Sequence, residues 1–116
     1  MSNPASHEAD GTLPSATAIL GRAAQHQRER AKAYDQPGGE RSAGRIAAAF
    51  NAITGRTGER AISEAEAWLF LQVLKQVRLF SAPGYHADSA EDNVSYGSLL
   101  AEAKAREAID QLSRGT

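Results

Sequence analysis

The chain has 116 residues, with 13 basic and 14 acidic side chains, a net charge of −1 and no cysteine. Without cysteine, a disulfide framework, a zinc–thiolate site and a thiol nucleophile are all excluded. A charge so close to zero disfavours nonspecific nucleic-acid binding, which depends on neutralising many phosphates with basic side chains. The length is typical of one domain with a single modest core.

The first 14 residues, MSNPASHEADGTLP, are small and polar and offer nothing to pack. We therefore expect a disordered tail over residues 1–14 and a single helical domain over residues 15–114. The tail lacks a basic stretch followed by an apolar run, so we expect no secretory signal. The most apolar segment, AWLFLQVLKQVRLF, contains two charges and is too short to span a bilayer. These features predict a cytoplasmic protein with no membrane partner.

Two helices are expected in the first half of the chain. The first covers residues 16–34, with Ser15 as its N-cap, and it ends at YDQPGGE because proline and paired glycines do not continue a helix. The second covers residues 42–54, where Ile46, Phe50 and Ile53 recur at i, i+4 and i+7. Gly55 follows as the residue that ends this helix.

Two more helices are expected in the second half. Ser63 and Glu66 have the spacing of a capping box, which predicts a third helix from Glu64 to Phe80. Apolar residues surround most of this helix, a pattern typical of a buried central helix. Ser89 and Asp92 resemble a second capping box and predict a fourth helix that continues to about residue 112. Strand-type alternation is not found, so we expect an all-α fold, a four-helix antiparallel array with short loops.

Lys75 and Arg78 are the main basic residues of the third helix, and their i, i+3 spacing places them on one face. Burying two cations is costly unless an anion meets them, and either a phosphate or a pair of carboxylates would serve. Alternatively, both side chains extend along the apolar surface and keep their charges in water.

Asp88, Glu91 and Asp92 form an acidic group at the start of the last helix, with Tyr96 on the same face as Asp88 and Asp92. Two carboxylates on one helical turn are ligands that Mg²⁺ accepts together with substrate phosphates. Acidic residues at a helix N-terminus are also favoured without any metal. A short loop would bring these carboxylates close to the two cations. The result is either a buried ion-pair network or a site where metal and cations share a phosphate, and the sequence leaves both open.

Three runs of the sequence resemble small phage and prophage proteins of uncharacterised function. They are YDQPGGERSAGRIAAAFNAITG, EAEAWLFLQVLKQVRLF and HADSAEDNVSYGSLLAEA, and the resemblance covers roughly residues 18–105. The matching positions are Tyr34-Asp35, Arg45 with Phe50, Lys75 with Arg78, and Asp88, Asp92 and Tyr96.

That family is similar, more distantly, to the all-helical nucleoside triphosphate pyrophosphohydrolases of the MazG type. Those enzymes bind Mg²⁺ through acidic residues on two neighbouring helices and cleave NTPs to NMP and pyrophosphate. The resemblance implies a MazG-like fold with a nucleotide site between the third and fourth helices, often completed by a second subunit. It implies Lys75, Arg78, Tyr96, Tyr34 and Arg45 for the nucleotide, and Asp88, Asp92 and Glu91 for Mg²⁺. The chain departs from the MazG pattern because Trp68, Leu69 and Leu71 occupy the turn that carries the acidic cluster in that family.

We expect one of two functions. Only the first includes catalysis, so the sequence leaves open whether the chain is an enzyme. One is a phage or prophage MazG-like nucleotide-binding protein with Mg²⁺-dependent hydrolysis of NTP or dNTP to the monophosphate and pyrophosphate. The other is a non-catalytic phage interaction protein that acts on a host factor or sequesters a ligand, for host takeover or counter-defence. A helix-turn-helix regulator is disfavoured because its recognition helix is expected to be too apolar to be exposed and lacks the side chains that read bases. Under both main readings we expect a homo-oligomer in the host cytoplasm, a dimer or higher, since four short helices bury limited area alone.

Overall fold

The computed structural model describes residues 13–34 and 42–115, and in this part of the chain it contains four α-helices and no strand. Helix α2 covers Ala16–Tyr34, α3 covers Ser42–Thr54, α4 covers Glu64–Ser81 and α5 covers Ala87–Gly115, with a short 3₁₀ turn at Gly58–Arg60. The expected all-helical class, with four helices packed together, is confirmed.

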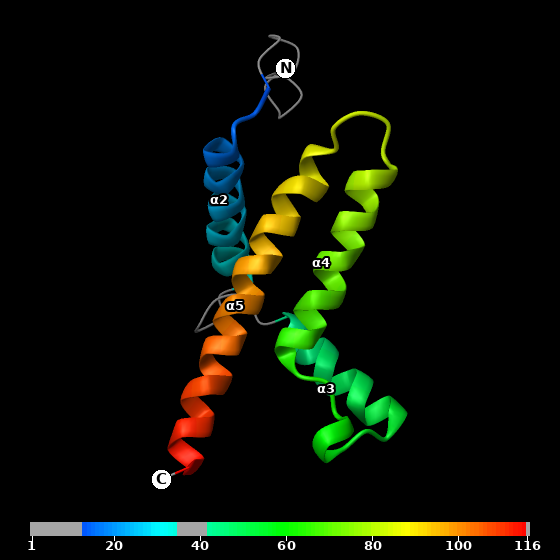
Figure 1. The fold of residues 1–116 in the computed structure, drawn as a ribbon, viewed down its shortest axis with the longest axis vertical. Coiled ribbons are helices and arrows are strands. Elements are labelled where there is room, and N and C mark those ends of the chain that lie inside the picture. Colours follow the sequence, from blue (N-terminus) through cyan, green and yellow to red (C-terminus); the bar gives the residue numbers. More distant parts are fainter. Residues whose placement is uncertain (1–12, 35–41, 116) are drawn as a thin grey trace.

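Helices α4 and α5 form a long antiparallel hairpin, as Figure 1 shows, with α2 against α5 and α3 against the start of α4. The expected antiparallel arrangement therefore holds for α4 and α5. Helix α2 instead runs in the same direction as α5, because Arg22 contacts Glu91 while the later Gln27 reaches Ser98. The arrangement is elongated, with extents of 55 × 27 × 24 Å.

Helix starts are fixed by local hydrogen bonds that the sequence predicts. The Ser15 hydroxyl accepts the Ala18 amide at 3.1 Å at the start of α2. At the start of α4, the Ser63 hydroxyl accepts the Glu66 amide at 3.1 Å, and the Glu66 carboxylate accepts the Ser63 amide at 2.9 Å. This reciprocal pair is the expected capping box, and it satisfies two amides that have no partner within the helix.

The second expected capping box is wrong. Helix α5 begins at Ala87, so Ser89 lies inside its first turn, where the side chain is fully buried. The Asp92 carboxylate turns away from the helix start and binds basic side chains of α2 and α4. The Asp92 carboxylate therefore forms long-range ion pairs and does not cap the start of α5.

The apolar core is small and lies where α3, α4 and α5 meet. Its largest side chain is Trp68, which is 1% exposed and has its ring centroid 5.3 Å from that of Tyr96. Most other buried members are alanines, namely Ala43, Ala47, Ala65, Ala67 and Ala103, together with Leu99. The Gln72 side chain of α4 packs against Gly97 of α5, where a Cβ atom would lie 2.9 Å from Gln72 Nε2.

The expectation that the third helix is buried on all sides is wrong. Helices α3 and α5 cover one side of α4, and six apolar side chains on its other positions are 41–88% exposed. Five of them form what we call the α4 stripe: Leu69, Phe70, Val73, Val77 and Phe80. In the part of the chain that the structure describes, α4 and the other helices lack the length and apolarity needed to cross a membrane.

Replacing Ser63 by alanine removes one half of the capping box and leaves the Glu66 amide without its partner. We expect Ser63→Ala to lower the free energy of unfolding by about 1 kcal/mol in urea denaturation. Ser81→Ala is the matched control, because this exposed hydroxyl only donates to the Val77 carbonyl within the same helix. Its effect should stay within about 0.5 kcal/mol. Equal losses in the two variants would contradict a specific role for the box.

Candidate functional site

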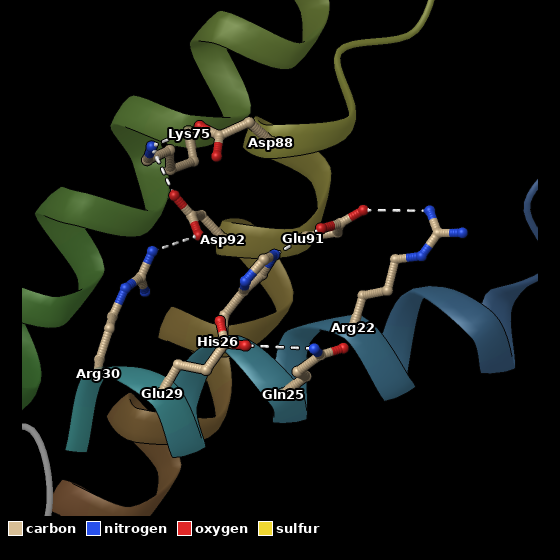
Figure 2. Close-up of polar contacts among 9 residues, drawn as sticks. All are labelled: Arg22, Gln25, His26, Glu29, Arg30, Lys75, Asp88, Glu91 and Asp92. Carbon is tan, nitrogen blue, oxygen red and sulfur yellow. Dashed lines mark hydrogen bonds and ion pairs between the residues drawn. The ribbon is translucent and has the colours of Figure 1, made fainter. Parts of the chain in front are cut away.

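A group of ionisable side chains gathers where α2, α4 and α5 meet. Figure 2 shows this polar cluster, to which three helices contribute charged groups. Its members are Arg22, His26 and Arg30 from α2, Lys75 from α4, and Asp88, Glu91 and Asp92 from α5.

Asp92 is the most heavily bonded carboxylate of the polar cluster. Lys75 Nζ lies 2.7 Å from Asp92 Oδ2, and Arg30 Nη2 donates to Asp92 Oδ1 at 2.9 Å. Both carboxylate oxygens therefore have a cationic partner, and the Asp92 side chain is only 4% exposed. Lys75 also reaches Asp88 Oδ2 at 3.4 Å on the exposed rim of the cluster. The Arg30 guanidinium lies 5.8 Å from the centroid of the Tyr96 ring.

Glu91 makes a separate set of contacts with α2. Its Oε1 atom lies 2.7 Å from His26 Nε2, and its Oε2 atom lies 3.5 Å from Arg22 Nη1. The Glu91 and Asp92 side chains leave α5 in different directions, as Figure 2 shows, and meet different basic groups. Two adjacent residues of α5 therefore contact three basic side chains of α2 and one of α4.

The pKa values of Asp92 and Lys75 reflect this pairing. Burial alone would raise the pKa of Asp92, but the hydrogen bonds and charges of Lys75 and Arg30 outweigh it and hold the pKa below its ordinary value of 3.8. Burial alone would lower the pKa of Lys75, but the hydrogen bond and charge of Asp92 and the charge of Asp88 raise it above 10.5. Both groups are therefore charged at pH values between 3.8 and 10.5.

The charges of the polar cluster balance without any ligand. Three groups that are always cationic near neutral pH, Arg22, Arg30 and Lys75, face the three carboxylates of the cluster. His26 adds a fourth positive charge only when it is protonated. With His26 neutral the charges of the cluster balance, but two of its buried atoms, Glu91 Oε2 and Arg22 Nη1, lie 3.5 Å apart and have no hydrogen-bond partner among the described residues.

The structure brings together only part of the expected nucleotide site. Lys75 and Tyr96 lie at the polar cluster, whereas Arg78 and Arg45 are exposed and take no part in it. The Tyr34 side chain lies outside the described residues.

The expected metal ligands are separated in the same way. Asp88 and Asp92 share Lys75, while Glu91 faces α2. Among the described residues, groups of three or more histidine or carboxylate side chains able to hold a metal ion are not found. The assignment of Mg²⁺ to Asp88, Glu91 and Asp92 stays a prediction.

The contribution of α2 to the cluster was not predicted. Arg22, His26 and Arg30 recur at i, i+4 and i+8, so they share one face of the helix. This row of basic groups is a sequence signal that a buried acidic partner exists elsewhere in the chain. The signal does not identify the partner, because the contacts join residues more than 60 positions apart.

An open cavity of about 380 Å³ lies away from the polar cluster, between the start of α4 and the middle of α5. Leu69 and Leu100 give it apolar walls, and Glu66, Lys104 and Glu107 add charged groups. Ser63 and Ala65 complete its lining. The cavity borders the α4 stripe, since Leu69 belongs to both.

Comparison of the chain with models of known protein families, with curated proteins and with solved structures finds no match in any of the three. The resemblance to phage proteins and to MazG-type enzymes therefore stays a prediction.

The pKa of Asp92 sets the expected pH dependence of stability. Because the folded-state pKa lies below 3.8, the contribution of this carboxylate is fully present above pH 3.8 and is lost as pH falls through the folded-state value. We expect Asp92→Asn to lower the free energy of unfolding by about 3 kcal/mol near pH 7, because two cations lose their partner. The difference from the unmodified chain should shrink in urea titrations performed progressively below pH 3.8.

Asp88→Asn is the matched control for this experiment. The Asp88 side chain is 69% exposed and makes one long contact with Lys75, so its removal should change stability by less than about 1 kcal/mol. A loss in Asp88→Asn as large as that in Asp92→Asn would show that the buried carboxylate has no special role.

Proposed function

We propose that the chain is a non-catalytic protein-binding scaffold, in which the polar cluster holds α2, α4 and α5 together and the exposed face of α4 binds a protein partner. The observation that carries this proposal is the pairing of Asp92, whose two oxygens are both bound by basic groups of the chain itself. In this reading the acidic and basic residues of the cluster are structural.

Ligand binding at the polar cluster would have to break these pairs. Mg²⁺ held between Asp88 and Asp92 would displace Lys75, whose side chain is 11% exposed, and would leave its ammonium group poorly solvated. A phosphate bound by Lys75 and Arg30 would compete with the Asp92 carboxylate that already neutralises them. Both events oppose existing short contacts, so the geometry favours a structural network.

The exposed apolar surface supports a protein partner. Phe70 is 69% exposed and Phe80 is 88% exposed, and together they present on the order of 300 Å² of aromatic surface. Three more apolar side chains of the α4 stripe add to this area. A monomeric protein rarely exposes a contiguous apolar patch larger than a few hundred Å², and larger patches mark interaction sites.

A second candidate is the MazG-like nucleotide-binding protein, with Mg²⁺-dependent hydrolysis of NTP or dNTP to monophosphate and pyrophosphate. The juxtaposition of Lys75, Asp88 and Asp92, with Tyr96 beside Arg30, supports it. In this reading the contacts within the cluster would open when the nucleotide and metal bind. The two candidates differ in what removal of Lys75 does.

We expect Lys75→Ala to lower the free energy of unfolding by about 3 kcal/mol, because it removes one partner of a buried ion pair. The melting temperature should fall by roughly 10 °C for a domain of this size. Lys104→Ala is the matched control: this lysine is exposed and pairs only with Glu107 on the same helix, so the melting temperature should hardly change. Equal melting temperatures for the two variants would contradict a structural role for Lys75.

Nucleotides give the complementary test. The purified chain should show neither pyrophosphate release nor a rise in melting temperature when mixed with each common NTP and dNTP, with or without Mg²⁺ or Mn²⁺. A metal-dependent rise that disappears in both Lys75→Ala and Asp92→Ala, and persists in Lys104→Ala, would overturn the scaffold proposal and establish the nucleotide site. Pyrophosphate release with the same dependence would establish an enzyme.

A further inference from the structure

We infer that the protein partner of the α4 stripe is a second copy of this chain, bound antiparallel through α4 about a two-fold axis at Val73. This inference rests on the proposed function, since it identifies the partner of the scaffold. A two-fold dimer uses the same surface on both copies, so that surface has to be complementary to itself. The positions, the shape and the charges of the stripe meet this requirement.

Three of the five stripe positions are symmetric about Val73, whereas Phe70 and Phe80 lie level with the partner's Gln76 and Glu66. Leu69 lies four residues before Val73 and Val77 lies four residues after it, so all three share one face of the helix. Antiparallel pairing centred there places Val73 against the partner's Val73 and Leu69 against the partner's Val77. From Glu66 to Phe80 the contact runs for about 21 Å along the helix. This side of α4 points away from the buried side at Trp68, Leu71 and Lys75, so pairing leaves the core and the polar cluster intact.

The shape of the surface provides a place for the most exposed aromatic side chain. Phe80 is 88% exposed at the end of α4, and the cavity of about 380 Å³ opens at the start of the same helix. In the antiparallel pairing, Phe80 of each copy lies level with the partner's Glu66, at the rim of the cavity that Leu69 and Leu100 line. Each dimer would therefore contain two equivalent contacts of the Phe80 ring with a cavity whose lining combines Leu69 and Leu100 with charged side chains.

The charges of α4 favour antiparallel over parallel pairing. Glu66 lies at the beginning of the stripe, whereas Arg78 lies at the other end of α4 on the flank of the helix, about 100° around the axis from Val77. Antiparallel pairing brings the acidic end of one helix towards the basic end of the other. Parallel pairing would bring like charges together, and it would leave the cavity unfilled because Phe80 would face the partner's Phe80.

The segments beyond the described ranges, MSNPASHEADGT and DQPGGER, contain no Val, Ile, Leu, Phe or Trp. A standard stable interface covers about 800 Å² on each partner, and the five partly exposed side chains of the stripe present less than this. We therefore expect a homodimer with a dissociation constant in the micromolar range.

The oligomeric state of the full chain tests the inference. Sedimentation velocity over a wide micromolar concentration range should show a monomer–dimer equilibrium. Val73→Glu should weaken it by at least about 100-fold, because each dimer would bury two like charges at its axis. Its melting temperature at monomeric concentrations should equal that of the unmodified chain, since Val73 is outside the core. Ile109→Glu, at a 63% exposed position of α5, is the matched control and should leave the equilibrium unchanged.

Cysteine cross-linking tests the register, because the chain has no cysteine of its own. Val73→Cys should form a covalent dimer with a short thiol–thiol cross-linker. Leu69→Cys alone and Val77→Cys alone should not, because each thiol would lie about 12 Å along the helix from its copy. An equal mixture of the Leu69→Cys and Val77→Cys chains should cross-link.

A chain that stays monomeric at every concentration, or a dimer unaffected by Val73→Glu, would overturn the inference. Cross-linking of Val77→Cys with itself in preference to Val73→Cys would overturn the proposed axis. These failures leave the scaffold proposal standing, since the stripe would remain available to an unlike protein. Conversely, metal-dependent nucleotide binding that requires Lys75 would overturn the scaffold proposal whether or not the chain dimerises.

Discussion

The structure depends on two buried carboxylates that are adjacent in the sequence, Glu91 and Asp92. Consecutive residues of an α-helix point about 100° apart, so the two cannot share one set of partners. Burial requires that each be paired, because an unpaired charge in the interior is strongly unfavourable. Glu91 is therefore paired by α2, while Asp92 is paired by α2 and α4 together. These two residues make α5 the element around which the other two helices are oriented.

The apolar part of the protein complements this arrangement. Within the core, alanine predominates, which allows the helices to approach closely but buries little area per residue. Apart from Trp68, Leu71 and Leu79, the larger apolar side chains of α4 are exposed. Orientation of the helices thus depends strongly on polar contacts, while much of the hydrophobic surface of α4 stays exposed. The same helix contributes Lys75 to the polar cluster and the stripe to the opposite side, so the ion pairs fix the direction in which the stripe faces.

Most of the local structure was predictable, because its causes are local: capping residues, proline, glycine and the helical period fixed the bounds of the first three helices closely. How much of α4 is buried was not predictable. A helix that is apolar on all sides has the same sequence pattern whether its own chain or a partner covers it. Only part of the polar cluster was predictable. The short loop predicts that Lys75 meets Asp88 and Asp92, whereas the contribution of α2 depends on contacts across more than 60 residues. Such contacts depend on packing, which one sequence does not specify.

The attachment of α2 has a consequence for the order in which the protein comes apart. Ala23 is the one fully buried side chain among those described in α2, and the helix is joined to α5 by hydrogen bonds between residues 62 to 71 positions apart. Helices α4 and α5 are instead neighbours in the chain and share the Trp68 core. Segments held by few apolar contacts open at lower free energy than the core, and contacts between distant residues form late in folding. Amide hydrogens of α2 should therefore exchange with solvent through local detachment, while those of the α4–α5 hairpin wait for global unfolding.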